Sequence, residues 1–161
     1  MCQAKTAATT ALSSTVSRRP TYRGMRMYRA HTVSAGIPVD PKLVYAYASD
    51  PANLPTWAIG LVKSIERQGT SWIAQTPFGQ VAIRFAAAND FGVLDHDVDL
   101  PAGTLHNPMR VIPNGAGSEV LFTLIQNPDV SDEQFQRDMD TVRADLNKLR
   151  TVLEHRYGSA V

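Results

Sequence analysis

Residues 131–157 read SDEQFQRDMDTVRADLNKLRTVLEHRY, and their hydrophobic spacing decides the fold. Ser131 and Gln134 have the spacing of a capping box, which marks the first turn of a helix. Apolar residues then recur at intervals of four and three, which places them on one stripe of a helix that ends near Tyr157. The stripe consists of Phe135, Met139, Val142, Leu146, Leu149 and Leu153. A helix with one apolar stripe must bury it against another layer.

The residues that precede this helix predict a sheet as that layer. Between residues 61 and 126, short alternating runs of apolar and polar residues are typical of antiparallel strands joined by hairpins. Breaks at Gln68-Gly69, Pro77-Phe78, Asn89-Asp90, residues 101–103 and Pro113-Asn114-Gly115 divide this region into six strands. A first strand over residues 27–34 makes seven, and we expect the long helix to cover one face of the sheet.

Two short helices are predicted between the first strand and the second. Asp40-Pro41 and Asp50-Pro51 each combine an N-cap side chain with a proline at the first helical position. Because Pro55 disfavours helical geometry at Leu54, the second helix should be only about one turn long.

Composition indicates one globular domain. Of the 161 residues, 43% are hydrophobic and 19% are charged. The net charge of +1 gives no electrostatic reason to expect nucleic acid as a partner. No apolar run reaches the ~18 residues of a membrane span. The single cysteine, Cys2, offers no disulfide and no cysteine-based metal site, so we expect a cytoplasmic location.

The N-terminus has a different composition. The first 39 residues contain no Asp or Glu and are rich in Ala, Thr, Ser and Arg, which resembles a transit peptide in composition. A disordered tail, or a start site that truly lies at Met25 or Met27, explains the same composition. We assign residues 1–25 to a disordered or non-native tail and residues 26–158 to the folded domain.

The stretch VLDHDVDL, residues 93–100, concentrates three aspartates and a histidine. In a strand, Asp95, Asp97 and Asp99 share one face, while His96 points to the other. Alternate residues of a strand lie about 6.6 to 6.8 Å apart, which is too far for these acids to share one ion. We therefore expect no metal site, with an adventitious ion between Asp97 and His106 as the open alternative.

Three predicted turns agree in sorting charged from apolar side chains. They are a two-residue loop at Asn89-Asp90, a loop within residues 100–103 and a four-residue loop over residues 113–116. The pairs that this register predicts are Arg84 with Asp95, Asp97 with His106, His96 with Asn107 and Arg110 with Glu119. Opposite charges across strands contribute about 0.2 to 1 kcal/mol each, so we interpret the charged face as an exposed, ion-paired surface.

The same register places His96 on the apolar face, between Ile83 and Asn107 and beneath the long helix. A buried imidazole without a partner costs about 1 to 3 kcal/mol, and Asn107 is positioned to supply a hydrogen bond. Two interpretations stay open: a satisfied core histidine, or a residue that lines a ligand cavity.

The sequence resembles the START-like, or SRPBCC, superfamily, which includes polyketide cyclases and the birch pollen allergen. The resemblance covers about residues 27–157. It rests on the order of elements and on DPANLPTW (50–57), FGVLDHDVDL (91–100), PMRVIPNGAGSEVLFTLI (108–125) and the helix that begins SDEQFQRD. It implies an α+β helix-grip fold: a seven-stranded curved antiparallel sheet that grips a long C-terminal helix, with two short helices between strands 1 and 2.

The resemblance also implies an apolar cavity between the sheet and the helix, with no cofactor. The register then assigns the candidate ligand-binding residues as Trp57, Trp72, Ile83, Phe85, Leu94, His96, Asn107, Met109, Phe122, Phe135, Met139 and Val142. For Trp57 and Trp72, plain core packing is the alternative role.

Three functions follow from this assignment. The first is binding of a small hydrophobic or lipid-like molecule, oriented by His96 and Asn107. The alternative is an enzyme that resembles polyketide cyclases and aromatases, in which His96 acts as general acid or base and Asn107 polarises a carbonyl. The third is self-association as a homodimer through an outer-face patch formed by Leu121, Thr123 and Ile125.

Overall fold

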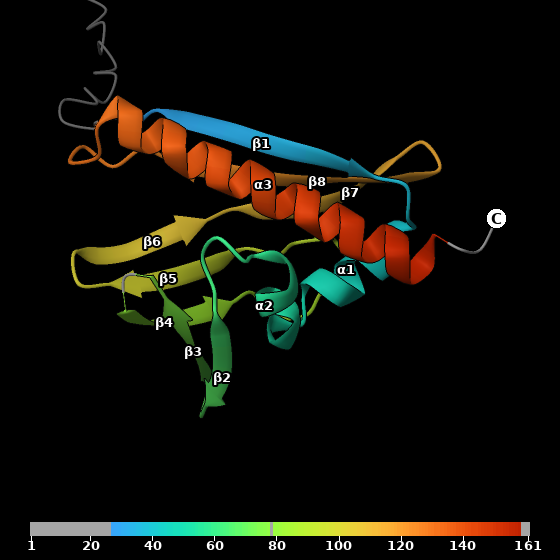
Figure 1. Cartoon of the computed structure of the whole chain (residues 1–161), viewed down its shortest axis with the longest axis horizontal. Helices are drawn as coiled ribbons and strands as arrows, with labels where there is room; N and C mark the ends of the chain where they lie inside the picture. The colour runs from blue at the N-terminus through green and yellow to red at the C-terminus, as the bar shows by residue number, and fades with distance from the viewer. Residues whose placement is uncertain (1–26, 78, 159–161) are drawn as a thin grey trace, which may run out of the picture.

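The computed structural model describes residues 27–77 and 79–158, so the tail predicted for residues 1–25 lies outside the described residues. Figure 1 shows a curved sheet with one long helix and several short helical segments. In chain order the elements are β1 (Ala30–Ile37), α1 (Pro41–Ala48), a 3-10 turn (Pro51–Asn53), α2 (Leu54–Trp57), β2 (Ser64–Gln68), β3 (Ser71–Thr76), β4 (Gly79–Phe85), β5 (His96–Leu100), β6 (Gly103–Asn107), β7 (Met109–Asn114), β8 (Gly117–Ile125) and α3 (Asp132–Tyr157).

The strands pair antiparallel in two groups, β1-β8-β7 and β2-β3-β4-β5-β6. A bridge between Val93 and Arg110 joins the groups. Next to it, the Leu94 amide donates to the Met109 carbonyl over 2.9 Å. Residues 92–100 and 103–111 thus run as two long paired strands. The two groups together form one curved sheet with seven strand positions, as predicted. Pro108, which has no N–H to donate, divides the second long strand into β6 and β7.

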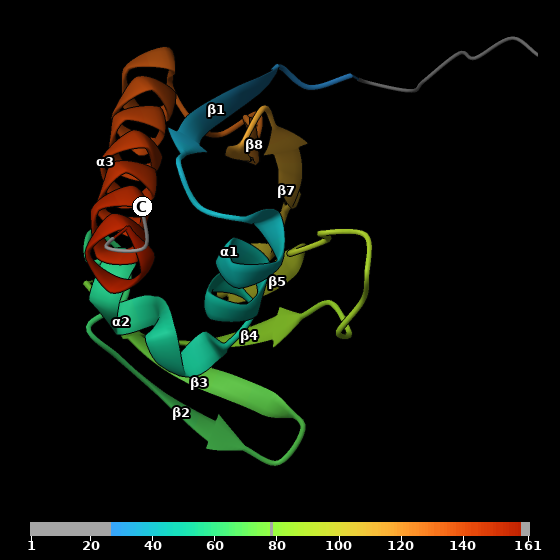
Figure 2. The ribbon, with the colours of Figure 1, turned by 90° about the vertical axis from the view of Figure 1, so that its right-hand side faces the viewer.

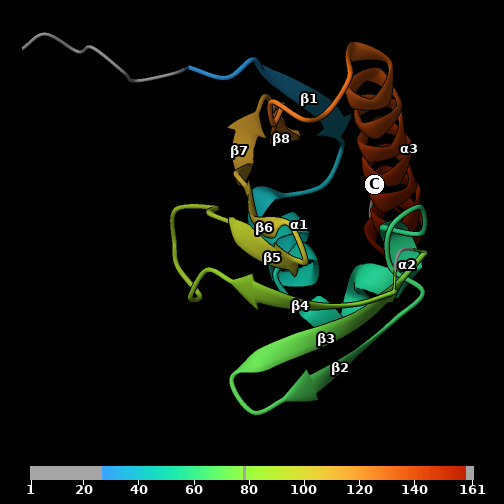
Figure 3. The same ribbon diagram turned by 90° about the vertical axis from the view of Figure 1, so that its left-hand side faces the viewer.

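The long helix forms as predicted. The Ser131 side chain caps it by accepting a hydrogen bond from the Gln134 amide over 3.2 Å. The Gln134 side chain binds Asp138 instead of completing the capping box. All residues of the predicted apolar stripe are buried. Figures 2 and 3 show α3 running beside β1, with α1 lying inside the curve of the sheet.

The first strand and the short helices differ in detail from the prediction. β1 spans Ala30–Ile37, because its pairing with β8 begins at Ala30 and continues to Ile37. Both Asp-Pro signals cap helical turns as expected: Asp40 and Asp50 each accept a hydrogen bond from the amide two residues on. Leu54, however, has helical geometry, with φ −50° and ψ −45°. Pro55 is tolerated after it because it lies in the first turn of α2, where no N–H is required.

Two predicted hairpin registers are wrong by two residues. Arg84 lies opposite Asp97 instead of Asp95, because the connection between β4 and β5 is a long loop over residues 86–95. Arg110 lies opposite Leu121 instead of Glu119, because the β7–β8 turn has two residues. A shift of two leaves every side chain on its predicted face. The predicted pairs in the β5–β6 hairpin, His96 with Asn107 and Asp97 with His106, are confirmed.

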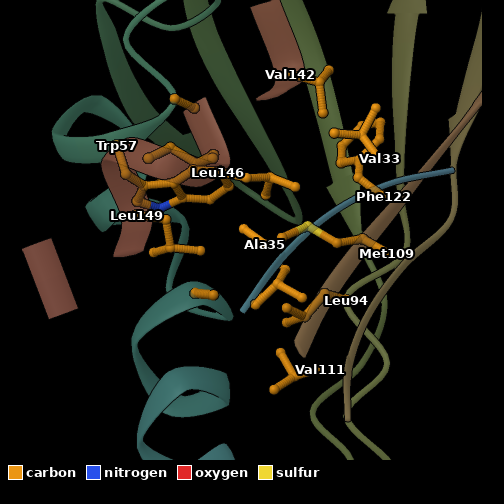
Figure 4. Close-up of a cluster of buried hydrophobic side chains, with 14 of the residues drawn as sticks. Val33, Ala35, Trp57, Leu94, Met109, Val111, Phe122, Val142, Leu146 and Leu149 are labelled. Carbon is orange, nitrogen blue, oxygen red and sulfur yellow. The ribbon is translucent and has the colours of Figure 1, made fainter. Parts of the chain in front are cut away.

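The hydrophobic core lies between α3, the two short helices and the concave face of the sheet. Figure 4 shows Trp57 of α2 over Leu146 and Leu149 of α3, with Met109 of β7 close to the centre of the cluster. No helix within the described residues is long and apolar enough to cross a membrane.

Glycine is required at position 92, where the loop before β5 meets β7. Gly92 has a φ of +70°, and a Cβ added there would overlap the Val111 carbonyl oxygen. Gly69, in the β2–β3 turn, has a similar φ of +62° but open space around it.

Gly92 and Gly69 provide a matched test, because both have a positive φ but only Gly92 has a backbone atom where a Cβ would lie. We expect Gly92→Ala to lower the free energy of unfolding by about 3 kcal/mol or more, because backbone strain and a steric clash combine. Gly69→Ala should lower it by only about 1 to 2 kcal/mol, from strain alone. Urea unfolding measures both values, and equal losses would contradict the pairing of residues 91–94 with β7.

Candidate functional site

The acidic stretch that stands out in the sequence forms an ion-paired outer surface. Arg84 binds Asp99, Arg110 binds Asp95, and the His106 Nδ1 lies 2.6 Å from Asp97 Oδ1. These side chains are all substantially exposed, and such pairs contribute little to stability. No group of three possible metal ligands occurs among the residues that the structure describes.

A small cavity lies on the opposite, concave face, where α1 and α2 approach the sheet. Its volume is about 80 Å³. The helices contribute one wall, and β4, the loop over residues 86–95, β5 and β7 contribute the other. The lining residues are Tyr45, Ala48, Ser49, Leu54, Trp57, Phe85, Ala86, Ala88, Val93, Leu94, Asp95, His96 and Met109. Most of these side chains are apolar, so the cavity favours an apolar occupant.

The structure brings part of the predicted site together at this cavity and places the rest elsewhere. Trp57, Phe85, Leu94, His96 and Met109 line it. Two further candidates, Trp72 and Asn107, are partly buried on the same concave face. The others pack in the closed core: Ile83, Phe122, Phe135, Met139 and Val142.

The prediction put the cavity under α3, whereas the structure puts it under α1 and α2. α3 packs against β1, β8 and α2, and its apolar stripe is buried there. The missed lining residues come from α1 and its C-cap (Tyr45, Ala48 and Ser49), from Leu54 of α2 and from the loop over residues 86–95. Alternation along a strand cannot place these segments, and the two-residue loop predicted at Asn89-Asp90 concealed the length of the connection between β4 and β5.

His96 is held in one orientation on the cavity wall. Its ring lies 5.6 Å from the Phe85 ring and 5.8 Å from the Phe122 ring. The Nδ1 atom lies 3.1 Å from the Leu94 carbonyl oxygen, so Leu94, and not Asn107 as predicted, is its hydrogen-bond partner. A carbonyl can only accept, so the proton sits on Nδ1. In the neutral ring, Nε2 is therefore a hydrogen-bond acceptor.

Burial keeps this ring neutral near pH 7. The apolar surroundings lower the pKa of His96 below its usual value of 6.5, although the Leu94 carbonyl and the nearby carboxylates of Asp95 and Asp97 favour the charged form. Loss of hydration outweighs these attractions. His96 is thus an oriented, uncharged side chain on the cavity wall.

One side chain organises the loop over residues 86–95. The Asn89 Oδ1 accepts hydrogen bonds from the Phe91 and Val93 amides, each over 3.0 Å. Its Nδ2 donates to the Ala87 and Val93 carbonyls. The Asn89 amide in turn donates to the Tyr45 hydroxyl over 2.9 Å. The two cavity walls are therefore joined by one hydrogen bond between α1 and the loop.

A buried carboxyl group joins α3 to the segment that follows α2. Asp145 of α3 accepts a hydrogen bond from the Gly60 amide over 3.1 Å, just after the cavity residue Trp57. Its second oxygen, Oδ2, is buried without a partner among the described residues, and so is the Trp57 Nε1. Burial raises the pKa of Asp145, against the opposing effect of the Gly60 amide. The contact between α2 and α3 thus contains an incompletely satisfied acid.

The effect of Asp145 on stability depends on pH in a predictable direction. Its folded pKa is raised above the unfolded value of 3.8, so the protein gains stability as the pH falls through the folded pKa toward 3.8. We expect Asp145→Asn to be more stable than the wild type at pH 7, by about 1 kcal/mol, with the difference vanishing near pH 4. Urea unfolding between pH 4 and 8 measures this. Asp140→Asn, at an exposed site of the same helix, should show no such trend, and a less stable Asp145→Asn at pH 7 would contradict the interpretation.

Comparisons with known proteins agree on the fold. No protein-family model matches the chain, and no curated protein matches it in sequence.

Solved structures do match. The XoxI protein of Bacillus cereus has 18% identity and a TM-score of 0.63, over 76% of this chain and 94% of its own. The Aha1 dimer of Colwellia psychrerythraea has 14% identity and a TM-score of 0.64, over 78% and 96%. The protein Ara h 8.0201 has 14% identity and a TM-score of 0.57, over 78% and 97%. The described residues therefore adopt the helix-grip fold of START-like, or SRPBCC, proteins.

Proposed function

We propose that the protein binds a small, uncharged, mainly apolar molecule in the cavity between the short helices and the sheet. The observation that carries this proposal is an apolar cavity whose wall holds one neutral, oriented histidine. Hydrophobic lining with a few placed polar groups is the usual chemistry of small-molecule sites. The structural neighbours support the proposal at the level of fold alone.

The size of the cavity limits the ligand. Its volume of about 80 Å³ is smaller than the ~150 Å³ in which an engineered cavity holds benzene. A short chain fits within it, whereas a molecule with a ring must extend through the open side of the cavity along the concave face. A longer, lipid-like molecule would extend along the concave face toward Trp72 and Asn107, which are partly exposed there.

A second candidate is an enzyme that uses His96 as a general base, because its Nε2 is unprotonated in the neutral ring. A structural neighbour, DynU16, is described as a putative protein in the dynemicin biosynthetic locus, with 15% identity, a TM-score of 0.59 and coverage of 78% of this chain and 47% of its own. The remaining charged group of the lining, Asp95, already binds Arg110 and the Met109 amide. Among the described residues, the cavity lining holds no further carboxylate, histidine or lysine, so binding is the better supported function.

Self-association as a homodimer stays a prediction. Leu121, Thr123 and Ile125 share the outer face of β8 and retain partial exposure in the single chain.

Titration with toluene tests the binding proposal. Toluene should shift the amide resonances of Trp57, Leu94 and Met109 saturably in ¹H–¹⁵N spectra, because these residues line the cavity. Ala48→Leu should weaken binding by at least about tenfold, since the added carbons occupy a cavity of this size. Ala144→Leu, at an exposed position of α3, is the matched control and should bind as the wild type does.

The outcomes separate the possibilities. Saturable binding that is lost only in Ala48→Leu supports the proposed site. Absence of binding to the wild type, or equal binding to both variants, contradicts it. Turnover of a poly-carbonyl substrate that disappears in folded His96→Ala protein would favour the enzyme.

A further inference from the structure

We infer that the ligand carries a hydroxyl group, which binds between His96 and Asn107 at the edge of the cavity. This inference rests on the proposed function and names the chemical class of the molecule. It follows from two neighbouring hydrogen-bonding groups on the concave face that make no hydrogen bond within the described residues.

The first unused atom is the Nε2 of His96. The Nδ1–H of this ring is committed to the Leu94 carbonyl, and the flanking Phe85 and Phe122 rings fix the plane of the imidazole. No hydrogen bond to Nε2 is present among the described residues. Because Nε2 in this tautomer only accepts, its complement on a ligand must be a donor.

The second unused group is the side-chain amide of Asn107. Asn107 on β6 lies directly opposite His96 on β5, so their Cβ atoms are about 4.5 to 5.5 Å apart and share the concave face. Asn107 is partly buried, and its side chain makes no hydrogen bond within the part of the chain that the structure describes. An amide offers two N–H donors and a carbonyl acceptor. An unused amide beside an unused imidazole nitrogen, on a face that is otherwise apolar, defines a polar spot for two-point recognition.

A hydroxyl satisfies both groups at once, because its O–H donates to Nε2 while its oxygen accepts from the Asn107 Nδ2–H. A ketone lacks the O–H or N–H donor that the His96 Nε2 requires. A carboxylate would bring a second negative charge near Asp95, and no basic side chain lines the cavity to receive it. An ammonium needs several acceptors, whereas Asp95 is already bound by Arg110. An alcohol or phenol with an apolar body is therefore the class that the wall fits.

Three probes of similar size test this inference: phenol, toluene and benzoate, each titrated into the full-length protein and followed by ¹H–¹⁵N spectra. Wild-type protein should bind phenol at least as tightly as toluene, and benzoate at least about tenfold more weakly. His96→Phe preserves an aromatic ring between Phe85 and Phe122 but removes Nε2. It should weaken phenol binding by about tenfold and change toluene binding by less than about twofold.

Two further variants complete the design. Asn107→Leu removes the second partner and should also weaken phenol selectively, which keeps the test decisive if His96→Phe folds poorly. His106→Phe changes the histidine of the neighbouring strand on the opposite, solvent-exposed face, so it should leave the affinity for all three probes unchanged.

Failure of the inference and failure of the proposed function give different results. If toluene and phenol both bind and neither His96→Phe nor Asn107→Leu distinguishes them, the cavity exists and the hydroxyl assignment is overturned. Tighter binding of benzoate than of phenol also overturns it. If neither toluene nor phenol binds the wild type, the proposed function itself is contradicted, and the hydroxyl assignment with it.

Discussion

The backbone pairing between residues 92–100 and residues 103–111 is the constraint on which the rest of the structure depends. The same register runs from the β5–β6 hairpin, past Pro108, to the hydrogen bond between the Leu94 amide and the Met109 carbonyl. Because side chains alternate across a strand, this register sends Asp95 outward and His96 inward. A slip of one residue would exchange an ion-paired surface for a wall of buried acids, which is energetically prohibitive.

The position of the cavity follows from how the helices share the concave face. α3 buries its apolar stripe against β1 and β8, so that part of the sheet is closed. α1 and α2 are short and irregular, and they leave a gap over β4, β5 and β7. The hydrogen bond between Tyr45 and Asn89 joins the two sides of that gap, and Asp145 joins α3 to the segment that follows α2. The site is therefore built from the less regular half of the fold, as sites that must admit a ligand commonly are.

The sequence predicts the layers of this fold better than it predicts the site. The α3 stripe and the alternation in residues 93–100 depend on local periodicity, which is why the helix, the curved sheet and the inward histidine could be predicted. Errors of two residues at two hairpins did not move any side chain to the other face of the sheet, because side chains alternate between the faces with a period of two. The cavity wall supplied by α1 and residues 86–95 depends on long-range packing and on the side-chain bonds of Asn89, and no pattern in the sequence specifies those. Strand alternation also does not predict that the His96 ring bonds to the Leu94 backbone carbonyl, because alternation gives only the face on which a side chain lies.

The central claim is that an apolar cavity, open to a small molecule, lies between the short helices and the sheet. A crystal structure under xenon pressure tests it most directly, because xenon occupies apolar cavities without needing a hydrogen-bond partner. The account predicts a xenon atom in contact with Trp57, Leu94 and Met109. Side chains that fill this space, or xenon bound only beneath α3, would contradict it.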